Sequence, residues 1–341
     1  MIPVASRAAA GSSSELRQIR VPDGTRLAYR LYGPGPVPSA ERAKVILCDG
    51  ISCDGYIWRD LLPVLARDAD VLHLNYRGHG RSGLPKAPAD CTLAHLASDV
   101  DFVLAALGWS NAILIGHSMG VQVALEAAFR YPERVRALVL CCGSFGRVLD
   151  TFRNTDLGAR LLPFLDAVTQ TWRSHVSAAM RAILPSPLTY VIAALTEIKS
   201  ERIRPKDFQP YLDHFARMPM DLFMGLLSDA AQRTSLPFLA RVQQPTLIIA
   251  GQDDGFTPLA SSRLMATTLP HAELLVVPGT SHTAPLEAPE TFERAITTFI
   301  AGLPTPTSAP ADDWGWPSSV WGTAETANAT EPTKSIINHG R

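Results

Sequence analysis

Short apolar runs rich in valine, isoleucine and leucine recur along the chain and predict buried strands. They alternate with longer segments in which apolar residues return every three or four positions, as they do in amphipathic helices. Strands are expected at 16–21, 26–32, 44–48, 71–75, 113–115, 137–142, 245–250 and 272–277, and helices at 58–67, 92–107, 289–300 and from Gly120 and Pro258 onward. This alternation predicts an α/β fold with a doubly wound, mostly parallel sheet.

The alternation stops between residues 144 and 239, where the pattern is helical, interrupted by prolines and apolar on several faces. We interpret this segment as a helical lid inserted between two strands, over the carboxyl edge of the sheet. The α/β core would then comprise residues 16–143 and 240–302. Residues 1–15 and the Pro-, Thr-, Ala- and Ser-rich stretch 303–341 are expected to be a disordered leader and tail. Trp314, Trp316 and Trp321 are unusual for such a tail, and the sequence gives no account of them.

Length and composition narrow the function classes. A chain of 341 residues fits one large α/β domain with an insertion. A net charge of −1 gives no electrostatic case for a nucleic-acid or membrane-surface partner. Five cysteines, an odd number, suggest neither a disulfide framework nor, by their spacing, a zinc site. We therefore expect a cytoplasmic protein with no membrane span, metal or cofactor that acts on a small molecule, and the oligomeric state stays open.

The sequence Gly116-His117-Ser118-Met119-Gly120 lies between a predicted strand and a predicted helix. A Gly-x-Ser-x-Gly motif in that context is typical of a nucleophile elbow, where a sharp turn presents the serine hydroxyl and small residues avoid clashes. The turn places the backbone N–H of Met119 where it can bind an oxyanion. The competing interpretation is an ordinary helix-entry turn, but the flanking elements favour Ser118 as a nucleophile.

A serine nucleophile needs a base, and the base needs an orienting acid. His282 follows the last predicted strand, where it could reach Ser118, and we favour it as the base over the alternative of a loop or core histidine. Asp253 and Asp254 follow the preceding strand, and either could instead cap the helix near Pro258. The order Ser, Asp, His is the one expected for this architecture.

These motifs resemble the α/β-hydrolase superfamily, in its branch of lidded serine esterases and lipases, over roughly residues 27–303. Family members often have Gly-x-x-Asp-x-x-x-Pro at the acid loop, which corresponds to Gly251, Asp254 and Pro258 and favours Asp254 as the acid. The stretch from His282 to Glu290 is similar to the family's histidine loop. The Arg77–Ser82 stretch resembles the loop beneath the site, which implies a structural role for His79.

One position departs from the family pattern. The strand before the first helix usually ends in His-Gly-x, and the N–H of the x residue is the second oxyanion donor. This chain has Asp49-Gly50-Ile51, so the Ile51 N–H is kept while the histidine is replaced. Asp49 is expected to anchor the loop, the alternative being that its charge alters the electrostatics near the oxyanion.

The leading hypothesis is a serine hydrolase that cleaves a small to medium carboxylic ester with an apolar moiety through an acyl-serine intermediate. Carbon–carbon bond hydrolysis, acyl transfer and perhydrolysis use the same triad and remain alternatives, as does a non-catalytic receptor on a hydrolase scaffold. The pocket is expected to draw on apolar residues of the lid, although any of them could be plain core; the candidates are Leu161, Phe164, Trp172, Phe223 and Met224.

Overall fold

The computed structural model describes residues 15–35, 42–151, 157–186, 188–190 and 203–304. The predicted leader and tail, with the three tail tryptophans, lie almost wholly outside these residues.

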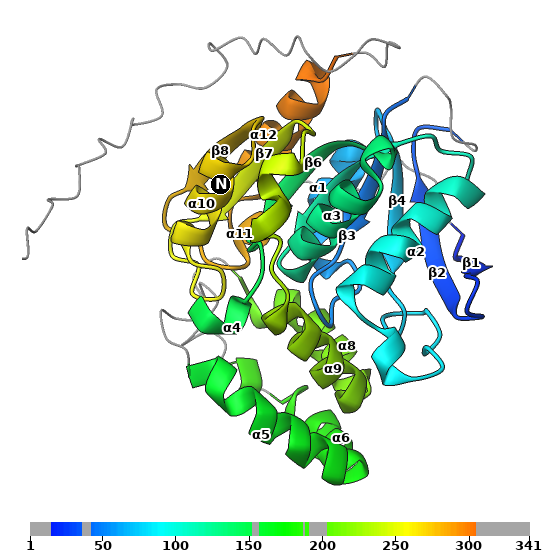
Figure 1. Ribbon diagram of the computed structural model, residues 1–341, viewed down its shortest axis with the longest axis vertical. Coiled ribbons are helices and arrows are strands. Elements are labelled where there is room, and N and C mark those ends of the chain that lie inside the picture. The colour runs from blue at the N-terminus through cyan, green and yellow to red at the C-terminus, as the bar shows by residue number, and fades with distance from the viewer. Residues whose placement is uncertain (1–14, 36–41, 152–156, 187, 191–202, 305–341) are drawn as a thin grey trace, which may run out of the picture. The chain divides into compact units, whose positions relative to one another are not determined.

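A single eight-stranded sheet forms the centre of the described part, in the order β1-β2-β4-β3-β5-β6-β7-β8 (Figure 1). β1 pairs antiparallel with β2 and β2 with β4, and every other pairing is parallel. The strands are β1 Arg17–Arg20, β2 Arg26–Tyr32, β3 Lys44–Cys48, β4 Asp70–Asn75, β5 Ala112–His117, β6 Val135–Cys141, β7 Thr246–Gly251 and β8 Ala272–Val277. The prediction of a mostly parallel α/β sheet is therefore confirmed.

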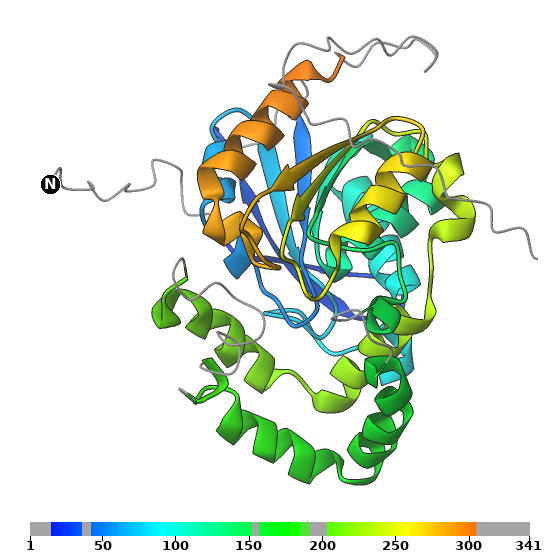
Figure 2. The ribbon, with the colours of Figure 1, turned by 90° about the vertical axis from the view of Figure 1, so that its left-hand side faces the viewer.

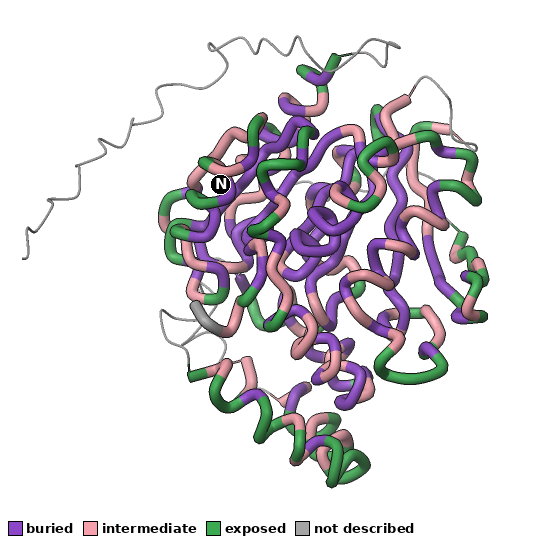
Figure 3. The backbone as a smooth tube through the Cα atoms, viewed as in Figure 1, coloured by how far each residue is buried: buried purple, intermediate pink, exposed green. Residues whose placement is uncertain are grey.

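The central strands are continuous apolar runs because helices cover both of their faces. β5 and β7 are buried at every position, whereas β1 and β8, at the two edges, are largely exposed or half-buried (Figure 3). Two helices, α1 (Leu61–Leu65) and α12 (Pro289–Gly302), pack together on one face (Figure 2). The other face is covered by α2 (Leu93–Ala106), α3 (Met119–Arg130) and α10 (Leu259–Thr268).

The helix expected at 58–67 is shorter than predicted. A 3₁₀ helix at Tyr56–Trp58 is followed by the five-residue helix α1. The reason is Pro63, which has no N–H to donate and whose ring would clash with the preceding turn of a continuous helix. In α1 the proline occupies the first turn, where the missing donor costs nothing.

Five described helices are inserted between β6 and β7, beyond the carboxyl ends of the parallel strands (Figure 1). They are α4 (Val148–Thr151), α5 (Leu157–Thr171), α6 (Arg173–Ile183), α8 (Pro205–Arg217) and α9 (Met220–Gln232). Their interior is a small apolar cluster separate from the main core. Gln122 of α3 donates to the Ala230 carbonyl at 3.0 Å, and Asp229 accepts from the Leu93 N–H at 2.7 Å. These two bonds fix α9 to the helices that cover the sheet.

Candidate active site

Ser118 occupies a strained turn between β5 and α3, with φ 56° and ψ −121°. Strand and helix approach so closely here that side chains on either side are excluded. A Cβ on Gly116 would lie 2.5 Å from the Gly120 carbonyl oxygen, and a Cβ on Gly120 would lie 2.0 Å from that of Cys48. Both glycines of the motif are therefore required by packing, and the turn presents the Ser118 hydroxyl at the carboxyl edge of the sheet.

His282 connects Ser118 to Asp254. Its Nε2 is 2.9 Å from Ser118 Oγ, and its Nδ1 is 3.0 Å from Asp254 Oδ2. The carboxylate only accepts, so Nδ1 carries the proton and Nε2 is free to accept the hydroxyl proton of the serine. This is the geometry of an activated serine nucleophile.

Asp254 is a buried carboxylate, and both of its oxygens accept hydrogen bonds. Its Oδ1 accepts from the backbone N–H groups of Phe256 (2.9 Å) and Thr257 (2.8 Å), and its Oδ2 accepts from Thr257 Oγ1 (2.7 Å). Burial alone would raise the pKa of Asp254, but the neighbouring His282 and the Thr257 hydrogen bonds hold that pKa below its ordinary value. Asp253, by contrast, is exposed. The structure brings the Asp254 carboxylate to His282.

The two residues expected to supply oxyanion donors, Ile51 and Met119, lie near Ser118. Ile51 and Met119 both line the cavity above Ser118, and a Cβ on Gly50 would lie 3.2 Å from Ser118 Cβ. Within the described ranges, neither the Ile51 N–H nor the Met119 N–H donates to another protein group. Both donors therefore remain available to an oxygen bound next to the nucleophile.

The sequence profile of the alpha/beta hydrolase fold matches residues 44–289, which is most of the chain and includes all of these residues. The chain belongs to the alpha/beta hydrolase family. The putative carbamate hydrolase RutD of Pseudomonas savastanoi is 27% identical over 261 residues, which cover 76% of this chain and 95% of that protein.

Solved structures agree with this assignment. A hydrolase from Pseudomonas aeruginosa superposes with a TM-score of 0.66 at 28% identity, covering 84% of this chain and 99% of that one. A thermophilic esterase from Thermogutta terrifontis has the same fold, with a TM-score of 0.65 at 22% identity and coverage of 85% and 99%. Among the helices that the structure describes, none is long and apolar enough to cross a membrane.

Asp49 of this alpha/beta hydrolase is buried at the end of β3, and both of its carboxylate oxygens are occupied. Trp58 Nε1 donates to Oδ1 at 2.7 Å, and His73 Nε2 lies 2.8 Å from Oδ2. Burial alone would lower the pKa of His73, yet the Asp49 carboxylate keeps that pKa above its ordinary value. These contacts tie the start of the oxyanion loop (residues 49–54) to β4 and to the 3₁₀ helix.

A cavity of about 540 Å³ opens above Ser118, between the sheet edge and the inserted helices. That volume is within the range of small-molecule sites. Aspartate, glutamate, lysine and arginine are absent from its described lining, which is mostly aliphatic and aromatic. The site is therefore suited to a neutral, apolar molecule.

The pocket residues expected from sequence are only partly in place. Leu161 and Phe223 line the cavity. For Phe164 and Trp172 the prediction is wrong: their side chains are 65% and 57% exposed, on the outer surface of the inserted segment. Met224 is buried inside that segment, in its apolar cluster, and is not among the lining residues.

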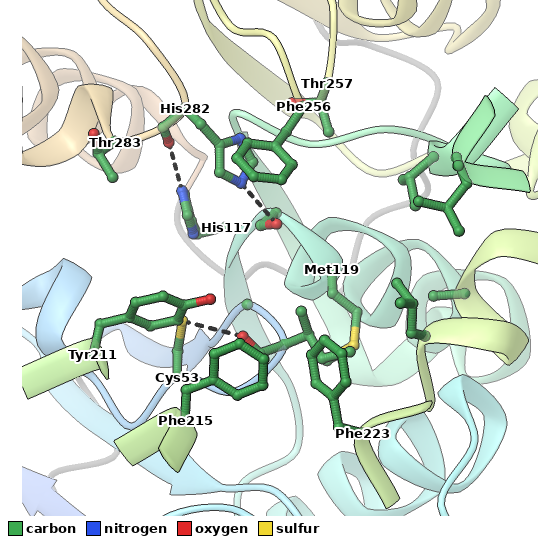
Figure 4. Close-up of a pocket in the computed structure, with 18 of the residues that line it drawn as sticks. Cys53, His117, Met119, Tyr211, Phe215, Phe223, Phe256, Thr257, His282 and Thr283 are labelled. Atoms are coloured by element: carbon green, nitrogen blue, oxygen red, sulfur yellow. Dashed lines mark hydrogen bonds between the residues drawn. The ribbon is translucent and has the colours of Figure 1, made fainter. Parts of the chain in front are cut away.

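Sequence reasoning missed the aromatic wall contributed by α8. Phe208, Tyr211 and Phe215 line the cavity together with Cys53 and His117, and Figure 4 labels all of these except Phe208. Their spacing, with Leu212, is that of one helix face, so the helical period of this segment could have identified them. Phe256 also lines the cavity, with its ring centroid 4.8 Å from that of His282.

Proposed function

We propose that this protein is a serine hydrolase that cleaves a neutral carboxylic ester with an apolar acyl or alcohol part through an acyl-serine intermediate. The observation that carries the proposal is the continuous chain of hydrogen bonds from Asp254 through His282 to Ser118, at the floor of an apolar cavity.

In this mechanism Ser118 Oγ attacks the ester carbonyl carbon while His282 Nε2 takes the hydroxyl proton. The N–H groups of Ile51 and Met119 stabilise the carbonyl oxygen as it becomes an oxyanion. Collapse of the tetrahedral intermediate expels the alcohol, which receives the proton from His282. A water molecule, deprotonated by the same imidazole, then releases the acid and restores Ser118. Asp254 holds the tautomer and stabilises the imidazolium.

The cavity lining favours a neutral substrate over an anionic one. A carbamate anion would carry its charge into a site whose described lining offers no lysine or arginine, and burying an unpaired charge is costly. A neutral ester avoids this cost. The bonded triad also weighs against a receptor without catalysis, because a binding site has no need of Asp254 and His282 in this geometry.

We assign the segment 144–239 the role of a lid, since its helices supply most of the apolar wall over Ser118. Exclusion of water by such a cover would favour transfer of the acyl group to an alcohol, an amine or peroxide. The same triad could also cleave a carbon–carbon bond next to a carbonyl. These reactions differ from ester hydrolysis in the acceptor or the bond cleaved, and the triad is common to all of them.

The test has two arms. A fluorophosphonate probe, mapped by mass spectrometry, should label Ser118 in the wild-type protein and leave Ser118→Ala unlabelled. A series of p-nitrophenyl esters from acetate to palmitate should give the highest kcat/KM at a medium chain length, with carbamate and other anionic acyl compounds as poor substrates. Absence of labelling and turnover in the wild-type protein would overturn the proposal. Faster turnover of the anionic compounds would overturn the substrate class alone.

A further inference from the structure

The peptide groups around Ile51 are held in one orientation by their own loop. Cys53 donates its backbone N–H to the Gly50 carbonyl at 3.3 Å. In a trans peptide the carbonyl and the following N–H point in opposite directions. The bond that fixes the Gly50 carbonyl therefore also fixes the direction of the Ile51 N–H.

The next peptide, between Ile51 and Ser52, is held from both sides. The Cys53 thiol lies 3.5 Å from the Ile51 carbonyl oxygen, the contact drawn from the Cys53 sulphur in Figure 4. On the opposite side, the Ser52 N–H donates to His79 Nε2 at 3.2 Å. Ser52 needs this support because its φ is 55°, in the left-handed region that residues with a Cβ rarely adopt.

His79 is fixed in the tautomer that this contact requires. The Ser52 N–H can only donate and the Arg77 carbonyl, 3.1 Å from His79 Nδ1, can only accept. Nδ1 therefore carries the proton and Nε2 offers its lone pair. Burial lowers the pKa of His79 to about 4, so the ring stays neutral near pH 7.

The support beneath His79 is itself rigid. Arg77 forms a bidentate, buried ion pair with Asp99, with distances of 2.8 and 2.6 Å, and donates to Asp23 at 2.7 Å. The two glycines that flank His79 have positive φ angles of 74° and 52°. A Cβ on the first would lie 2.1 Å from Leu222 on α9. The histidine is thus held between the sheet edge and the inserted helices.

We propose that His79 is a positioning residue for the oxyanion site: its Nε2 holds the Ile51–Ser52 peptide and thereby keeps the Ile51 N–H directed at the oxygen above Ser118. The inference rests on the proposed serine-hydrolase function. Loss of the acceptor releases the strained Ser52 turn and displaces the Cys53 N–H from the Gly50 carbonyl. The Gly50–Ile51 peptide is then free to rotate, and its N–H turns away from the oxyanion. The effect belongs to the transition state, because only there does the oxygen bear the charge.

Two substitutions separate the two hydrogen bonds of His79. In His79→Gln the side-chain oxygen reaches the position of Nε2 and still accepts from Ser52. In His79→Asn the shorter amide retains the donor for the Arg77 carbonyl but cannot reach Ser52. His214→Gln is the matched control. His214 is a buried histidine with its ring centroid 6.2 Å from that of His79, and its Nε2 accepts from the Gly80 N–H. Its Nδ1 lies 3.8 Å from Asp54, at the far end of the loop from the Ile51–Ser52 peptide.

The experiment measures kcat and KM for a p-nitrophenyl ester, and Ki for a trifluoromethyl ketone, which forms an oxyanion on the serine. His79→Asn should lower kcat about 10- to 100-fold, less than the roughly 100- to 1,000-fold lost when an oxyanion donor is removed altogether. In His79→Asn, KM should change little, and Ki for the ketone should rise by about the same factor by which kcat falls. In His79→Gln and in the control His214→Gln, kcat, KM and Ki should all stay near the wild-type values. Thermal unfolding is recorded for every variant, and His79→Leu replaces Asn if the Asn variant does not fold.

Wild-type kcat in His79→Asn, or in His79→Leu where the Asn variant does not fold, would overturn the inference and leave the proposed function intact. A Gln variant as slow as the Asn variant, or a change confined to KM, would overturn it as well. No ester turnover by the wild-type protein would overturn the proposed function itself, and this inference with it.

Discussion

His117, the residue immediately before the nucleophile, lies with Nε2 2.9 Å from the backbone carbonyl oxygen of His282. The carbonyl can only accept, so the imidazole Nε2–H donates and the elbow is tied directly to the loop that carries His282. Burial lowers the pKa of His117 to about 4, as it does for His79. Two buried, neutral histidines thus support the two sides of the site.

These two histidines predict a loss of stability in mild acid. Between pH 6.5 and 4 the unfolded chain protonates both residues and the folded chain does not, so the free energy of unfolding falls as the pH falls. Each group contributes up to about 1.4 kcal/mol per pH unit in this window. His73 does not offset the fall, because its pKa is raised in the folded state and it is protonated in both states below its unfolded pKa.

Urea unfolding from pH 7 to pH 4.5 checks this dependence. His117→Gln retains a donor for the His282 carbonyl but removes one titrating group, so the slope of unfolding free energy against pH should decrease by about 1.4 kcal/mol per pH unit at most. An unchanged slope in this variant would show that His117 is already protonated in the folded protein.

Ser118→Ala should abolish turnover of p-nitrophenyl esters while the thermal unfolding temperature stays within a few degrees of wild type. The hydroxyl is at the cavity wall, so its removal opens no void in the core. Circular dichroism on the same sample confirms that the protein is folded. Turnover at the wild-type rate would mean that another group is the nucleophile.

The fold and the location of the site could be predicted because both depend on local patterns. Apolar runs separated by helical periods specify a parallel sheet, and residues that follow its strands converge at one edge. Ser118, Asp254 and His282 each follow a strand in this way, and the structure brings them together. The choice of Asp254 over Asp253 came from the resemblance, because adjacent residues in a turn differ in direction and no periodicity describes that difference.

The wall of the cavity could not be predicted as well. An apolar stripe on a helix identifies an apolar face, but it does not show whether that face packs against another element or is exposed to solvent. On α5, Leu162 faces inward whereas Phe164, two residues later, is largely exposed. The hydrogen bonds of Asp49 could not be predicted from the sequence either. Trp58 and His73 come from separate elements, and only the tertiary structure brings them to the same carboxylate.

Asp254→Asn should lower kcat by up to about 10⁴-fold, the scale on which a serine protease loses activity when its orienting carboxylate becomes an amide. The amide cannot accept from Thr257 and from His282 Nδ1 at once, so the imidazole tautomer is no longer fixed. Asp253→Asn is the matched control one residue away and should leave kcat within about twofold, because it alters an exposed side chain and keeps the Asp254–His282 contact. If the two variants ranked in the opposite order, the acid would be Asp253.

The final prediction concerns Asp49. Asp49→Asn should leave kcat within tenfold of wild type and should lower the free energy of unfolding by roughly 1–3 kcal/mol, the range for a disturbed buried hydrogen-bond partner. Both carboxylate oxygens are taken up by Trp58 and His73, so the charge is compensated within the loop anchor and is not directed at the oxyanion. A carboxylate that did face the oxyanion would repel it, and its neutralisation would raise kcat, because a repulsion present only in the transition state would be gone. Steady-state kinetics and urea unfolding on the same preparation separate the two cases. A kcat more than tenfold above wild type would establish that repulsion, and one more than tenfold below would show that the Ile51 N–H depends on the Asp49 charge.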